Sequence, residues 1–161
     1  MPQIKAFFDD KTSTVTYVVW DSATREAAII DPVLDYEPHA ARLTTTSVDS
    51  VLDVAADLGL KVVWALDTHA HADHLSATHH IHEVTGAKVG IGARITEVQR
   101  VFSSMFHATD VCPNGGAFNE LFDDGETFAL GDLTVRVMHT PGHTPACVTY
   151  VIDDAAFVGD T

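Results

Sequence analysis

The sequence is poor in positive charge. Lysine and arginine together account for only nine of the 161 residues, against 23 aspartates and glutamates, so the formal net charge is −14. The nine basic residues are scattered, and no basic face for nucleic acid can be assembled from them. The same acidity disfavours an anionic membrane surface as a partner. We interpret the negative charge as a source of solubility.

Cysteine and long apolar runs are also scarce. The two cysteines, Cys112 and Cys147, are far apart in the sequence and predict free thiols rather than a disulfide framework. Apolar stretches such as 62–66 and 146–152 are far shorter than the ~18 residues of a membrane-spanning helix. The first ten residues contain no extended apolar region of the kind found in signal peptides. We therefore expect a soluble, cytoplasmic protein.

The apolar pattern predicts one domain, over residues 1–161, with strands first, then alternating strands and helices, and strands again at the end. With 46% apolar residues, a chain of this length can bury a sizeable core. Runs of β-branched and aromatic residues predict strands over 4–8, 15–20, 27–30, 61–66, 87–91, 127–130, 133–138, 147–152 and 155–158. Together with the helices described next, this order is typical of an α/β layered architecture, with a mixed sheet and helices packed outside it.

Helical spacing of apolar residues predicts three helices, over 48–58, 75–85 and 94–107. Ser47 is expected to cap the first helix and Gly59 to end it. Residues 35–47 are expected to form a polar connection. The sequence stops at 159–161 without a polar tail or a closing helix, so we expect a domain that is incomplete at its C-terminus.

Histidine is abundant, and six of the ten histidines lie between residues 69 and 82. His69, His71, Asp73 and His74 follow directly on the apolar run 61–66 and supply three imidazoles and one carboxylate. These donors suit zinc, iron or nickel. In an extended loop, side chains two residues apart point the same way, so His69 and His71 can converge on one ion. A solvated polar run at the start of a helix is the alternative, but chance rarely supplies four ligand-type residues at this spacing.

Two further segments carry candidate ligands. Residues 139–145 contain two prolines and a glycine, which make a rigid turn that can fix His143 as a third ligand. His139 closes the strand before that turn, and we interpret it as structural, with contact to a metal ligand as the alternative. Asp160 follows the apolar strand 155–158, and strand ends are where the site residues of α/β folds collect.

The remaining histidines and the second cysteine are interpreted as structural or surface groups. His79, His80 and His82 fall on the predicted helix after the histidine cluster, where solvated side chains are the expected outcome. Cys147 lies among apolar strand residues and is expected to be buried rather than nucleophilic.

Taken together, these segments resemble the metallo-β-lactamase-fold superfamily. The closest resemblance is to its persulfide dioxygenase branch (sulfur dioxygenases, ETHE-type), and within it to bacterial β-lactamase-hydrolase-like members, which carry an extra segment like 95–122. The matching stretches are 25–34, 67–74, 140–149 and 159–160. The resemblance implies an αββα sandwich built from two similar halves, of which this chain covers the first half and a little more. A late histidine of the family falls outside these residues.

The resemblance implies one Fe²⁺ per chain, held by His69, His143 and Asp160. Two histidines and one carboxylate leave open positions on non-haem iron. His71, Asp73 and His74 would orient the ligands and a bound water, and Asp73 and His74 would in this way act in catalysis. The implied enzyme is an iron-dependent persulfide dioxygenase, which oxidises glutathione persulfide with O₂ to sulfite and glutathione in sulfide metabolism. A homodimer is compatible with this interpretation.

Two alternatives remain open. The first is a dinuclear Zn²⁺ hydrolase of the glyoxalase II type, acting on a glutathione thioester. There, His69, His71 and His143 would hold one ion, Asp73 and His74 the second, and Asp160 would bridge them. The other alternative is a fragment that binds metal without catalysis.

Overall fold

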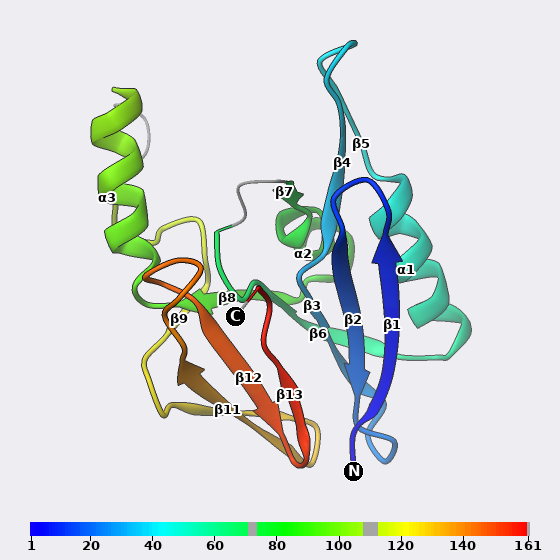
Figure 1. Ribbon diagram of the computed structural model, residues 1–161. Coiled ribbons are helices and arrows are strands. Elements are labelled where there is room, and N and C mark those ends of the chain that lie inside the picture. The colour runs from blue at the N-terminus through cyan, green and yellow to red at the C-terminus, as the bar shows by residue number, and fades with distance from the viewer. Residues whose placement is uncertain (71–73, 108–112, 161) are drawn as a thin grey trace.

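The computed structural model describes residues 1–70, 74–107 and 113–160, and its largest element is a six-stranded mixed sheet (Figure 1). The first two strand pairs of this sheet are antiparallel and the remaining pairs are parallel. Its strands are, in order across the sheet, β1 (Gln3–Asp9), β2 (Thr14–Trp20), β3 (Glu26–Ile30), β6 (Lys61–Leu66), β8 (Lys88–Gly92) and β9 (Glu120–Phe122). The apolar run 61–66 therefore lies inside the sheet, as expected.

A second sheet is antiparallel throughout. Its four strands are β10 (Thr127–Leu130), β11 (Leu133–His139), β12 (Val148–Ile152) and β13 (Ala155–Phe157). Buried residues of both sheets form one apolar core, in which Trp64, Phe122, Phe128 and Tyr150 bring their rings together. The two sheets therefore pack face to face, because each buries one apolar surface against the other.

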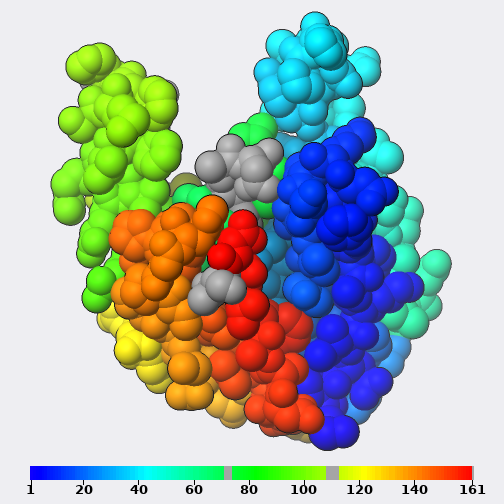
Figure 2. Space-filling view, in the orientation of Figure 1, coloured from blue at the N-terminus to red at the C-terminus, as the bar shows by residue number. Residues whose placement is uncertain are grey.

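Helices cover the other face of the six-stranded sheet. Helix α1 (Thr46–Asp57) and helix α2 (Thr78–Thr85) pack against it through a second apolar core that includes Val51 and Ile81. Helix α3 (Ile95–Phe106) instead projects away from the body of the molecule (Figures 1 and 2). The predicted α/β layered architecture is thus confirmed. No helix in the described part of the chain is both long and apolar enough to span a lipid bilayer.

Three local predictions were wrong. Residues 35–47 are not a plain connection, because β4 (Val33–Glu37) and β5 (Arg42–Thr44) pair as an exposed hairpin, and β4 also pairs with β7 (Leu75–Ser76). The second helix consequently begins at Thr78, since residues 75–76 are in β7. Thr45, not Ser47, is the N-cap of α1; the Ser47 hydroxyl donates to Asp35 Oδ1 at 2.7 Å.

Asp21, in the turn between β2 and β3, is expected to make the folded protein less stable in acid. The Asp21 carboxylate accepts hydrogen bonds from the backbone N–H groups of Asp132 (3.0 Å) and Ala23 (3.1 Å) and from the Thr24 hydroxyl (2.8 Å). These donors, Asp132 first, lower the pKa of Asp21 from 3.8 to about 2. The unfolded chain therefore binds this proton at a higher pH than the folded chain does.

We accordingly expect the stabilising effect of the Asp21 carboxylate to be present above pH 4 and to be lost as the pH falls toward 2. Urea unfolding of the wild type and of Asp21→Asn at several pH values between 7 and 2 measures this. The variant should be less stable at pH 7, and the difference should shrink in acid. A difference that is constant over the whole range would contradict the prediction.

Candidate metal centre

Three predicted ligands converge although they come from three separate segments of the chain. His69 lies in the loop after β6, His143 in the turn between β11 and β12, and Asp160 just after β13. Their ligand atoms all lie within 4.8 Å of one another. Asp160 Oδ2 is 3.7 Å from His143 Nε2 and 4.0 Å from His69 Nε2. The two imidazole rings meet edge to face, with 4.9 Å between their centroids.

This spacing and this donor set fit a single metal ion. Two ligand atoms about 2.1 Å from one ion lie roughly 3 Å apart at a right angle and roughly 4.2 Å apart when opposite. The distances to Asp160 fall within that range. Two imidazoles and one carboxylate form the donor set of non-haem Fe²⁺ sites, and Zn²⁺ accepts the same donors.

The exposure of the three ligands is uneven. The side chain of His69 is completely buried, whereas those of His143 and Asp160 are 41% and 54% exposed. The site therefore has a protein-covered side at His69 and an open side between the other two ligands. A small molecule can reach it from the open side.

Buried polar contacts fix the loop that carries His69. The backbone N–H of Thr68 donates to Asp31 Oδ1 at 2.7 Å, and the Thr68 hydroxyl lies 2.9 Å from His69 Nδ1. The hydroxyl of Tyr150 donates to the carbonyl of Asp67 at 2.9 Å. Burial, followed by the charges of Asp31 and Asp67, raises the pKa of Tyr150 well above 10.0, so its hydroxyl remains a donor.

The turn that carries His143 is held by its own residues. The backbone N–H groups of Thr140 and Thr144 donate to the carbonyl and the sulfur of Cys147, at 3.0 and 3.2 Å. His139 Nε2 lies 2.9 Å from the carbonyl of Pro145 and, facing an acceptor, must donate to it. His139 thus has the structural role that the sequence indicated. Cys147 is a buried free thiol, as expected.

Asp160 reaches the site because a glycine precedes it. Gly159 has a φ of +58° and packs directly on Thr68, so that an added Cβ would clash with Thr68 Oγ1 and lie 2.9 Å from Thr68 Cβ. A larger residue would push the backbone, and Asp160 with it, away from His69. Sequence reasoning did not single out Thr68 or Gly159.

The other predicted site residues are placed differently. His71 and Asp73 lie outside the described residues, as does Cys112. His74 is buried, and its Nδ1 is 3.2 Å from the Thr14 hydroxyl; it does not belong to the three-residue group found among the described residues. The metal and catalytic roles expected of His71, Asp73 and His74 therefore stay predictions.

The three histidines of helix α2 have partners of their own. His79 is exposed and lies 3.3 Å from Glu83. His80 is half-buried, 3.0 Å from Asp49, and the Nδ1 of the half-buried His82 is 2.7 Å from the carbonyl of Ala87. The surface interpretation is confirmed for His79, and the other two histidines are partly covered.

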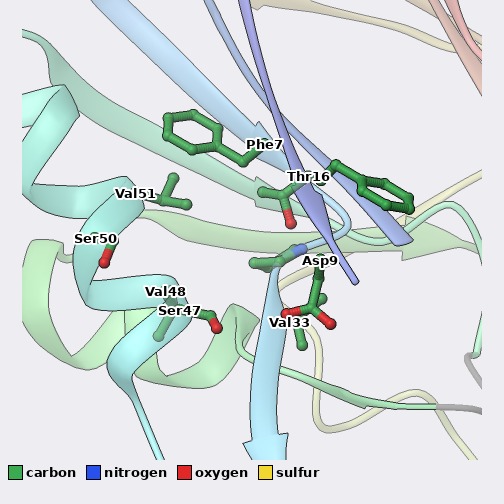
Figure 3. Close-up of a pocket in the computed structure, with 10 residues that line it drawn as sticks. Phe7, Asp9, Thr16, Val33, Ser47, Val48, Ser50 and Val51 are labelled. Carbon is green, nitrogen blue, oxygen red and sulfur yellow. The ribbon is translucent and has the colours of Figure 1, made fainter. Parts of the chain in front are cut away.

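One of the hollows on the surface adjoins the metal centre. It has a volume of about 340 Å³, and its wall is formed by α3, by His143 and its neighbours in the 139–147 turn, and by Ala70 in the loop after β6. A second hollow, of about 220 Å³, is shown in Figure 3; residues of β1, β2 and the start of α1, such as Phe7, Thr16 and Val51, line it. Of these two hollows, the first leads to a ligand of the three-residue group, His143.

Comparison with known proteins gives consistent matches. A family model described as the metallo-beta-lactamase superfamily matches residues 9–161. A beta-lactamase hydrolase-like protein of Xylella fastidiosa is 46% identical over 99% of this chain and 37% of its own length. Glyoxylase B2 of Dictyostelium discoideum is 39% identical over 99% of this chain and 56% of its own length. The mitochondrial persulfide dioxygenase ETHE1 of Homo sapiens is 31% identical over 98% of this chain and 51% of its own length.

The solved structures agree with these matches. The crystal structure of ETHE1 from Myxococcus xanthus has a TM-score of 0.76 to this chain at 30% sequence identity, and the match covers 97% of this chain and 56% of that one. The chain therefore spans little more than half, or less, of the length of the relatives it matches.

Proposed function

This chain belongs to the metallo-beta-lactamase superfamily, whose members are mostly metalloenzymes, and we propose that it carries the metal centre of an iron-dependent persulfide dioxygenase. The observation that supports this most is the convergence of two imidazoles and one carboxylate, from His69, His143 and Asp160. The resemblance to persulfide dioxygenases noted in the sequence agrees with the relatives and with the structural neighbour.

The proposed reaction converts glutathione persulfide, O₂ and one water into glutathione, sulfite and two protons. The outer sulfur gives up four electrons and O₂ takes up four, so no other reductant is needed. Bound Fe²⁺ would supply the O₂ activation that this oxidation requires.

The protein's own residues would position the reaction. His69, on the buried side, would fix the centre to the core of the protein, and the partly exposed His143 and Asp160 would face the incoming persulfide. Recognition of the glutathione part belongs to the proposal for the whole protein, because the chain spans only part of its relatives' length.

Metal content together with O₂ uptake tests this function. Protein purified without added metal is expected to contain about one iron per chain, measured by plasma mass spectrometry, and to consume O₂ and form sulfite when given glutathione persulfide. Iron without any O₂ consumption would contradict the dioxygenase, and metal without any activity would indicate a non-catalytic metal-binding module.

A second candidate is a dinuclear zinc hydrolase acting on a glutathione thioester. It is favoured by the 39% identity to a protein named glyoxylase B2. Two zinc ions per chain, hydrolysis of the thioester and no O₂ uptake would replace the dioxygenase with this function.

A further inference from the structure

We propose that Asp31 and Thr68 are positioning residues that hold the proton of His69 on Nδ1, so that Nε2 presents its lone pair to the metal ion. The inference deepens the proposed function and rests on its metal site. It does not depend on whether that metal is iron or zinc, because both bind a neutral imidazole through a lone pair.

The three residues form a continuous buried chain of hydrogen bonds. Asp31, Thr68 and His69 are each at most 4% exposed. Thr68 donates twice to the same carboxylate, through its backbone N–H to Oδ1 at 2.7 Å and through its hydroxyl to Oδ2 at 2.8 Å. The oxygen of that hydroxyl lies 2.9 Å from His69 Nδ1.

Only one placement of the protons satisfies this series of hydrogen bonds. A carboxylate only accepts hydrogen bonds, so the single hydroxyl proton of Thr68 points at Asp31. Thr68 Oγ1 can then meet His69 Nδ1 only as an acceptor, and Nδ1 must carry a proton. In the neutral ring the lone pair is left on Nε2, which is the atom that faces Asp160 at 4.0 Å.

Asp31, the acceptor at the start of this series of hydrogen bonds, is held in place by hydrogen bonds of its own backbone. Asp31 follows β3 with a φ of +51°, a left-handed conformation that aspartate adopts more readily than most residues. Its backbone N–H donates to the carbonyl of Leu66 at 2.8 Å, and its carbonyl accepts from the Thr16 hydroxyl at 2.7 Å. The carboxylate is thus placed by β2, β3 and β6 together, independently of a metal.

Thr68 also controls the second ligand. Gly159 packs on the Thr68 side chain, and the next residue is Asp160. One side chain therefore orients the imidazole of His69 and sets the approach of the segment that carries the carboxylate. Groups that orient metal ligands in this way change metal affinity by about 10–100-fold when they are removed.

The deciding variant is Asp31→Asn, which keeps the shape but changes the proton pattern. The amide oxygen would accept from the Thr68 N–H, so the amide NH₂ group would donate to Thr68 Oγ1. The hydroxyl proton would then turn to His69 Nδ1, and the ring proton would move to Nε2. We expect ¹⁵N NMR of the metal-free protein to show Nδ1–H in the wild type and Nε2–H in the variant. The dissociation constant for Co²⁺, followed by visible absorption, should rise by about 10–100-fold.

A pair of Thr68 variants gives the control. Thr68→Ser keeps the hydroxyl and should retain the Nδ1–H form and the Co²⁺ affinity, whereas Thr68→Val should lose both. His79→Ala, on the exposed face of α2, should leave both readouts unchanged. Circular dichroism establishes that each variant folds, and if Asp31→Asn does not fold, the Ser and Val pair decides alone.

Two results would overturn the proposal: Nε2–H at His69 in the metal-free wild type, or wild-type tautomer and Co²⁺ affinity in Asp31→Asn or Thr68→Val. These results are distinct from failure of the proposed function. Zinc in place of iron, or a lack of O₂ uptake, would reject the dioxygenase and leave the tautomer measurement as it stands.

Discussion

Replacing Asp160 with alanine is expected to remove bound metal, with an affinity loss of more than about 100-fold, because ligand loss should exceed the effect of losing an outer partner. Asp160 supplies one of three donors and the negative charge among them, since His69 and His143 bind as neutral imidazoles. His143→Ala should have an effect of similar size. Metal content after dialysis against a chelator, followed by titration with Fe²⁺ without oxygen, measures both.

The matched control for these ligand variants is His79→Ala. This imidazole is exposed and lies 3.3 Å from Glu83, on a helix that packs on the outer face of the six-stranded sheet. Its loss should leave metal content unchanged. Stoichiometric iron retained in Asp160→Ala or His143→Ala would refute the assignment of the three ligands.

Replacing Phe122 with alanine should destabilise the fold by about 3–5 kcal/mol, as is usual for a buried phenylalanine. Phe122 is the last residue of β9, and its ring lies 4.5 Å from that of Phe128, 5.8 Å from that of Trp64 and 6.4 Å from that of Tyr150, centroid to centroid. Its removal would leave a cavity where the two sheets meet. Urea unfolding at constant pH measures the difference in the free energy of unfolding.

An exposed phenylalanine provides the comparison. Phe8 in β1 is 61% exposed, and Phe8→Ala should change the free energy of unfolding by no more than about 0.5 kcal/mol. Equal losses for the two variants would show that the contact between the sheets does not dominate stability.

The elements predicted well from the sequence are those with a continuous or periodic apolar pattern. The continuous apolar run 61–66 predicted a buried strand, which is β6. Val48, Val51 and Ala55 recur at helical spacing, and they form the buried side of α1. The β4–β5 hairpin was missed because Tyr36 and Leu43 are exposed and their neighbours are polar. The paired residues 35–37 and 42–44 are half-buried or exposed, so these strands show no alternation of apolar and polar residues in the sequence.

The candidate site could be predicted only as far as residue chemistry reaches. His69, His143 and Asp160 are ligand types at a loop, a turn and a strand end, and the fold brings them together. The role of Asp31 depends on its contact with Thr68, 37 residues away, and the local sequence does not predict that contact. The rule that found Asp160 could have found Asp31, because both follow an apolar strand.

The three ligands connect the two sheets: His69 extends from the six-stranded sheet, and His143 and Asp160 extend from the four-stranded one. An ion held by all three would bind the folded chain and not the unfolded one, adding about 2.7 kcal/mol of stability when free metal is at 100 times its dissociation constant. Cellular proteases act on the unfolded fraction of a protein. In a metal-starved cell this protein would therefore have a shorter lifetime, and its abundance would follow the metal supply without any change in its synthesis.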